Sequence, residues 1–149
     1  MRAGYDYTGI DSSRGMVETT RRRLGSDARA DVADLNTYRP PEPVAATVCF
    51  AAGYYASDRA AFLGRVAGYT ERKLVFDFSP RQDPPEQWVG DLHAAGFTRV
   101  VLRPFFVPQS YSLPEPLQAA LERLERAPRL ARLILRWRFA YLCAAWREP

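Results

Sequence analysis

The sequence has few of the residues that build redox, metal or general-base sites. It contains 2 cysteines, Cys49 and Cys143, and a single histidine, His93. The cysteines lie far apart in apolar runs without the spacing of metal ligands, so we interpret them as buried thiols of a cytoplasmic protein and expect no metal site. His93 falls in an expected helix one turn before Gly96, where a structural role is favoured over that of a general base.

Long apolar runs and familiar catalytic motifs are also absent. No apolar run reaches the ~18–20 residues that a membrane span needs, and residues 1–11 lack the basic-then-apolar pattern of a signal peptide. There is no Walker loop, HExxH, GxSxG or paired CxxC. The sequence therefore gives no support to nucleotide hydrolysis, zinc proteolysis or α/β-hydrolase chemistry, and we expect no membrane partner.

Lysine is nearly absent, although the net charge is +4. All but one of the 21 basic residues are arginine, the exception being Lys73. Many of these arginines fall late in expected helices, where they complement the helix dipole whatever the partner. We interpret the excess of arginine over lysine as a general compositional bias and do not expect a nucleic-acid partner. RNA binding is an alternative that rests on the positive charge alone.

What is present is an alternation of strand-like and helix-like segments. Strands are expected over residues 5–11, 28–32, 44–51, 72–78, 97–107 and 139–146. Helices are expected over residues 12–24, 57–67, 85–95, from 114 to a break at Pro128, and over 130–136. This order predicts one α/β domain over residues 1–149, a mostly parallel sheet with helices on both faces and an antiparallel last strand. Residues 104–136 form a helical insertion before that strand.

Acidic residues end the first two expected strands, at the edge where parallel sheets bind ligands. The Asp11 carboxylate can accept hydrogen bonds from two ribose hydroxyls, or cap the following helix. Asp31 can accept from an exocyclic amino group while the Val32 N–H reaches an adenine nitrogen; otherwise Asp31 is a solvated turn residue. Met16 can pack on an adenine face or in the core.

Small and aromatic residues follow the apolar strand over residues 44–51. The small side chains let a cofactor approach the backbone, and Tyr54 and Tyr55 offer aromatic faces and hydroxyls to a substrate, or are one core and one surface tyrosine. In the insertion, Phe106 and Tyr111 can cover a substrate pocket as a lid, contact a second subunit in a homodimer, or pack in the core. Asp77 is a further carboxylate near a strand end, and we assign it no functional role.

Six segments, in order, resemble those of class I S-adenosylmethionine-dependent methyltransferases. They are YTGIDSSRGMVE, ADVADLNTY, VAATVCFAAGYY, KLVFDFSPR, LHAAGFTRVVLRPFF and FAYLCAAWRE. These segments resemble the second to the seventh strand of that family with the loops that follow them, and together cover nearly the whole chain. The resemblance implies a Rossmann-like sheet and methyl transfer from S-adenosylmethionine to a small-molecule acceptor.

The same resemblance implies roles for individual residues. Asp11 would hold the ribose, Asp31 and Val32 would contact adenine, and Phe50 would lie near the methionine part. The full set of implied cofactor residues is Asp11, Ser12, Met16, Asp31, Val32, Phe50 and Ala51. No universal catalytic residue is implied, because transfer from an activated sulfonium depends mainly on positioning.

One part of the family's pattern has no counterpart. Its first strand and Gly-rich loop should precede Asp11, and nothing in the sequence matches them. We therefore expect a sheet that is incomplete at its N-terminal side, with strand edges left unpaired. The alternative function is a truncated, non-catalytic methyltransferase-like remnant or interaction module. A nicotinamide-dependent dehydrogenase would also need a glycine fingerprint that is absent.

Overall fold

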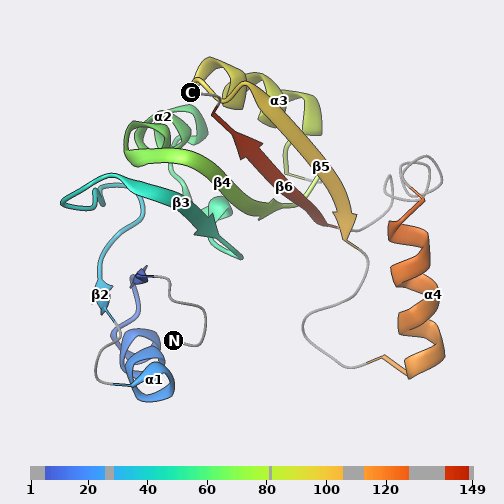
Figure 1. Cartoon of the computed structure of the whole chain (residues 1–149), viewed down its shortest axis with the longest axis horizontal. Helices are drawn as coiled ribbons and strands as arrows, with labels where there is room; N and C mark the ends of the chain where they lie inside the picture. The colour runs from blue at the N-terminus through green and yellow to red at the C-terminus, as the bar shows by residue number, and fades with distance from the viewer. Residues whose placement is uncertain (1–5, 26–28, 81, 106–112, 128–139, 148–149) are drawn as a thin grey trace.

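The computed structural model describes residues 6–25, 29–80, 82–105, 113–127 and 140–147 (Figure 1). The strands are β1 (Thr8–Asp11), β2 (Arg29–Val32), β3 (Val44–Cys49), β4 (Thr70–Phe78), β5 (Arg99–Phe105) and β6 (Ala140–Trp146). The helices are α1 (Arg14–Leu24), η1 (Gly53–Tyr55), α2 (Arg59–Tyr69), α3 (Pro85–Ala94) and α4 (Glu115–Glu125). The expected elements are confirmed to within a few residues; the expected helix over 130–136, Phe106 and Tyr111 lie outside the described residues.

The described strands form two sheets instead of one. β1 and β2 make a parallel pair, and the other four follow the order β3–β4–β6–β5. β3 is parallel to β4, whereas β6 is antiparallel to both β4 and β5. The α/β class and the antiparallel last strand are confirmed. The single, mostly parallel sheet is not observed: among the described residues the break falls between β1 and β3, where the resemblance places a middle strand.

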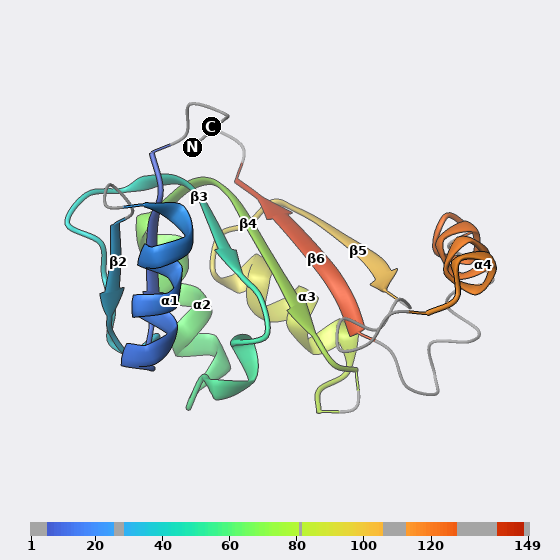
Figure 2. The same cartoon turned by 90° about the horizontal axis from the view of Figure 1, so that it is seen from below.

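The helices lie on both sides of the strands. α2 and α3 cover one face of the four-stranded sheet, whereas α1 packs beside β1 and β2 on the opposite side (Figure 1). Figure 2 looks onto the second face of the four-stranded sheet and shows the arrowheads of β2, β3 and β4 pointing the same way. No described helix is both long and apolar enough to cross a membrane.

The core lies between β4, β6 and the helices α2 and α3. Strand alternation sends Leu74, Phe76 and Phe78 toward these helices, and all three are buried. The Phe76 and Phe78 rings pack on Trp88 of α3, with centroids 5.1 and 5.2 Å away. His93 lies in the last turn of α3, and its Nδ1 atom is 2.8 Å from the main-chain oxygen of Phe97, just after the helix. This contact agrees with the structural role expected for this histidine.

Truncating a core side chain tests this packing. Leu74 is 0% exposed on the central strand, whereas Leu117 on α4 is 48% exposed. We expect Leu74→Ala to lower the free energy of unfolding by about 2–5 kcal/mol, because a buried cavity is left behind. The matched Leu117→Ala should cost less than about 1 kcal/mol. Urea denaturation measures both, and equal losses would contradict the described core.

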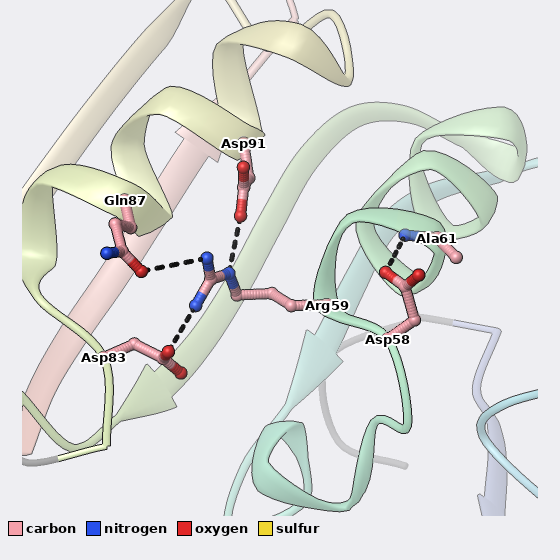
Figure 3. A network of polar contacts seen from close by, with 6 residues as sticks. All are labelled: Asp58, Arg59, Ala61, Asp83, Gln87 and Asp91. Atoms are coloured by element: carbon pink, nitrogen blue, oxygen red, sulfur yellow. Dashed lines mark hydrogen bonds and ion pairs between the residues drawn. The ribbon is translucent and has the colours of Figure 1, made fainter.

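Arg59, the first residue of α2, joins this helix to α3 (Figure 3). Its guanidinium lies 2.5 Å from Oδ2 of Asp91, 2.7 Å from Oδ1 of Asp83 and 3.3 Å from Oε1 of Gln87. It also lies over the Trp88 ring, 5.1 Å from the centroid. Burial alone lowers the pKa of Arg59, but the hydrogen bonds and charges of Asp91 and Asp83 outweigh it, so the pKa is raised. The cluster therefore fixes the loop after β4 as well as the two helices.

Replacing Arg59 tests the cluster. Arg59→Met leaves two partly buried carboxylates without their cation, and we expect a loss of about 1–3 kcal/mol in the free energy of unfolding. Arg59→Lys keeps the charge but not the planar fork, so it should restore only part of the loss. Arg14→Met, at the matching first position of α1 and exposed to solvent, should change stability by less than about 0.5 kcal/mol. Similar melting curves for Arg59→Met and Arg14→Met would refute the role given to the cluster.

Candidate functional site

The carboxyl ends of β2, β3 and β4 lie at one edge of the molecule (Figure 2), and β1 ends there too because it is paired in parallel with β2. Asp11 ends β1 and is paired in register with Val32, the last residue of β2, and Ile10 is paired with Asp31. Because side chains alternate along a strand, the Asp11 and Asp31 carboxylates leave the strand pair toward different faces. They are neighbours along the edge, so a ligand that contacts both must lie across the strand ends.

Asp11 connects β1 to α1. Its Oδ1 accepts a hydrogen bond from the Ser13 N–H at 2.7 Å, and Ser13 in turn caps the helix by accepting from the Met16 N–H at 3.4 Å. Ser13 is the capping residue, and Ser12 is exposed beside it. A carboxylate has about four acceptor sites, so this turn leaves capacity for further donors. Asp11 is therefore not the helix cap itself, but its carboxylate holds the capping residue, and this contact is compatible with the predicted role in holding a ribose.

Asp31 is paired with Arg21 of α1. The Arg21 Nη2 atom lies 3.3 Å from Oδ1 of Asp31, and the same guanidinium donates to the main-chain oxygen of Ala30. The Arg21 and Asp31 side chains are 53% and 64% exposed, so the pair contributes little, about 0–1 kcal/mol. The Ala33 N–H donates to the Asp11 main-chain oxygen, and the Val32 N–H, one residue earlier, therefore points away from β1. Both predicted adenine contacts are thus accessible.

The loop after β3 is held by Asp77, a residue that the sequence analysis assigned no role. The Asp77 carboxylate on β4 accepts from the Ala51 N–H at 2.6 Å. Ala51 has φ +50°, in the left-handed region that L residues seldom adopt. Strained backbone at a strand end is typical of functional loops, and here one carboxylate fixes it. The partners are 26 residues apart in sequence, which no local motif reveals.

The apolar and aromatic candidates at this edge are exposed. Met16 is 54% exposed, so it is not the core residue of the alternative interpretation, and Phe50 is 50% exposed. Tyr54 and Tyr55 are both exposed in η1, with ring centroids 4.3 Å apart. Large apolar side chains exposed together at one edge are typical of ligand-binding and interaction sites.

Asn36 ties the loop after β2 to the loop after β3. Its side-chain nitrogen donates to the Tyr55 main-chain oxygen at 3.2 Å, and its Oδ1 accepts from the Ser57 N–H at 2.9 Å. Asp34 orients Asn36 by accepting from both its main-chain and its side-chain nitrogen. This bridge links the part of the chain that carries Asp11 and Asp31 to the part that carries Ala51, and the sequence alone did not indicate it.

A shallow hollow of about 460 Å³ lies on the Asp31 side of the β1–β2 pair. Its lining residues are Thr8, Arg21, Arg29, Ala30, Asp31, Tyr38 and Pro41. It takes in Asp31 but not Asp11, Phe50 or Ala51. The predicted cofactor residues therefore share an edge, whereas this hollow holds only one of them.

The two cysteines are confirmed as free thiols, Cys143 buried and Cys49 half-buried. Burial, and then the negative charge of Asp77, raise the pKa of Cys49 to about 11; burial raises the pKa of Cys143 to about 12. Both thiols stay protonated near neutral pH, so neither is a reactive nucleophile there.

Alkylation tests these pKa values. At pH 8 we expect iodoacetamide to modify both thiols slowly in the folded protein, with the Cys49 rate rising about tenfold per pH unit toward pH 11, since the thiolate is the reactive form. Asp77→Asn should speed modification of Cys49 and leave Cys143 unchanged. The unfolded chain loses its thiol protons at a lower pH than the folded chain. The contribution of the two thiols to the free energy of unfolding should therefore be full below pH ~9 and be lost as pH rises through 11–12. Rapid stoichiometric labelling at pH 7, read by mass spectrometry, would contradict the raised pKa values.

Comparisons with known proteins give a fold but no close relative. No protein-family profile matches the sequence, and no curated protein matches it significantly. Among solved structures, magnesium protoporphyrin IX methyltransferase from Synechocystis with bound S-adenosylmethionine matches with TM-score 0.65 at 16% identity, over 99% of this chain and 62% of that one. The CMeT domain of the citrinin polyketide synthase matches with TM-score 0.67 at 12% identity, over 99% and 41%.

A third match is a methyltransferase from Thermotoga maritima, with TM-score 0.62 at 9% identity, over 95% of this chain and 73% of that one. The structure thus matches class I S-adenosylmethionine-dependent methyltransferases over nearly its whole length. The chain spans about three fifths of the Synechocystis enzyme (62%) and less of the citrinin synthase chain (41%). At these identities the match establishes a partial methyltransferase-like Rossmann fold.

Proposed function

We propose that this chain carries the adenosyl-binding edge of an S-adenosylmethionine-dependent methyltransferase that acts on a small molecule. One observation supports the proposal: Asp11, Asp31 and Val32 lie at the carboxyl ends of β1 and β2, and Ala51 lies just after β3, in the order that the resemblance requires. The arrowheads of β2 and β3 point to the same edge, and β1 is parallel to β2. The Synechocystis enzyme, which this fold matches, has been solved with S-adenosylmethionine and with S-adenosylhomocysteine bound.

The described residues fit the adenosine end of this cofactor. The Asp11 carboxylate has acceptor capacity for ribose hydroxyls, and the Asp31 carboxylate and the Val32 N–H offer an acceptor and a donor to the adenine edge. The exposed side chain of Met16 provides an apolar contact for the adenine ring, and the exposed side chain of Phe50 provides one near the methionine part. Among the described residues, nothing corresponds to the Gly-rich loop that would hold the methionine end.

S-adenosylmethionine, when bound, supplies a methyl group already activated on a sulfonium. The contribution of this chain is then to bind and orient. The Asp77 carboxylate fixes the Ala51 backbone, and Tyr54 and Tyr55 present rings and hydroxyls next to it for a small acceptor. Phe106 and Tyr111, the predicted lid residues, lie outside the described part of the chain. A homodimer through that insertion and a cytoplasmic location remain predictions.

Titration calorimetry with S-adenosylhomocysteine tests the proposal. We expect heat of binding at millimolar ligand, and an affinity about 5–10-fold weaker for Asp11→Asn and for Asp31→Asn, because each loses a charge-assisted hydrogen bond of about 1–1.5 kcal/mol. Glu18→Gln removes the same charge from the exposed surface of α1 and should leave the affinity unchanged. Equal affinities in all variants would place the ligand elsewhere.

The alternative function is a non-catalytic interaction module. The observation that favours it is the split sheet, which leaves β1 and β3 each with one unpaired edge among the described residues. If the wild-type chain gives no heat at millimolar S-adenosylhomocysteine, the cofactor proposal fails for this chain and the interaction module takes its place.

A further inference from the structure

The backbone of η1 is held by contacts at both ends, whereas its tyrosine side chains are exposed. Gly53 is buried, and a Cβ atom at this position would lie 3.7 Å from the main-chain oxygen of Asp77. The main-chain oxygen of Tyr55 accepts a hydrogen bond from the side chain of Asn36. Tyr54 and Tyr55 nevertheless remain 55% and 65% exposed. Rings presented from a preorganised backbone can contact a ligand at little cost in ordering.

The two tyrosine rings form one aromatic surface. Their centroids are 4.3 Å apart, and their planes are tilted by 45°. A side-chain hydrogen bond with Tyr55 raises the pKa of Tyr54, and the negative charge of Asp77 acts in the same direction. The Tyr54 hydroxyl therefore stays protonated near neutral pH. The exposed face of a neutral aromatic ring attracts an organic cation, because the electron density of the ring is concentrated there.

The charged groups that hold this part of the chain are acidic. Three carboxylates accept hydrogen bonds from the loop after β3, the start of α2 or the Asn36 side chain, and they belong to Asp77, Asp58 and Asp34. Within the described part of the chain, none of the three forms an ion pair. Arg59, the residue after Asp58, points the other way, toward Asp83 and Asp91 (Figure 3). The local charge therefore disfavours an anionic ligand beside the rings and favours a cationic one.

We propose that the methyl acceptor docked on Tyr54 and Tyr55 is an organic cation that carries its charge on an ammonium group. The ring faces attract the ammonium group, and the Asp77 carboxylate supplies a negative charge beside them. S-adenosylmethionine is itself cationic, so a second cation at this edge needs carboxylates nearby to balance the repulsion between the two. The role as methyl acceptor rests on the proposed function, whereas docking of the cation needs no cofactor.

The experiment titrates the isotope-labelled chain by NMR with probes of one shape and different charge. Choline is compared with dimethylbutanol, the neutral analogue in which carbon replaces the ammonium nitrogen, and with the anion dimethylbutanoate. At constant ionic strength and without cofactor, we expect saturable shifts of the Ala51, Tyr54 and Tyr55 amides with choline. Its affinity should be about 5–10-fold higher than that of dimethylbutanol, because only choline gains from the rings and the carboxylate. Dimethylbutanoate should bind most weakly.

Matched variants separate the rings from the charge. Tyr55→Leu should weaken choline binding about threefold or more, whereas Tyr55→Phe keeps the ring and should retain most of the affinity. Asp77→Asn keeps an acceptor for the Ala51 N–H but removes the charge, so it should weaken choline binding and leave dimethylbutanol binding unchanged. Tyr7→Leu changes an exposed tyrosine that precedes β1, away from this edge, and should have no effect.

The outcomes separate this proposal from the proposed function. Equal affinities for choline and dimethylbutanol, or shifts centred outside residues 50–58, would overturn the cation site even if S-adenosylhomocysteine binds. Displacement of choline by S-adenosylhomocysteine would also overturn it, because the rings would then belong to the cofactor. A chain that prefers choline but gives no heat with S-adenosylhomocysteine would keep the cation site and lose the methyl-transfer function.

Discussion

The pairing of β4 along both of its edges is the constraint on which the described structure depends. β3 binds one edge in parallel and β6 the other in antiparallel register, so the central strand has no unpaired stretch between Lys73 and Phe76. This fixes the alternation that sends Leu74 and Phe76 into the core and Val75 to the other face. It also fixes the position of Asp77, whose carboxylate accepts a hydrogen bond from Ala51 and so holds the loop after β3. The strand β4 therefore contributes residues to both the core and the candidate site.

The sequence predicted the elements well where local signals are strong. Gly25 after α1 and Asp58 before α2 mark helix ends in the expected places, and the continuous apolar run of β3 marks a strand. The edge shared by Asp11 and Asp31 followed from the strand–helix order alone. The start of α1 at Arg14 and the start of β4 at Thr70 each differ by two residues from the expected position, a difference that local preferences cannot settle.

The rest depended on contacts between distant segments. Asp77 had no assigned role because its partner, Ala51, becomes adjacent only when β3 and β4 pair. Asn36 lay in a loop defined by its prolines, and its link to Tyr55 and Ser57 arises only in the folded chain. Unpaired strand edges were expected from the sequence, but the division into two sheets and the degree to which Val48 is exposed required the structure. Local pattern therefore predicted which residues end strands, and tertiary pairing decided what those residues do.

The split sheet also sets what a ligand at this edge must do. Asp11 and Asp31 lie on the β1–β2 pair, whereas Asp77 lies on the four-stranded sheet and holds the Ala51 loop, and the described hydrogen-bonded links between the two parts include the Asn36 bridge but no strand pairing. A cofactor whose adenosine end contacts Asp11 and Asp31 and whose other end reaches Ala51 would therefore bridge the two parts. Its affinity should depend on the Asn36 bridge as well as on the residues that contact it, because the bridge holds the two sets of contacts in place before the ligand binds.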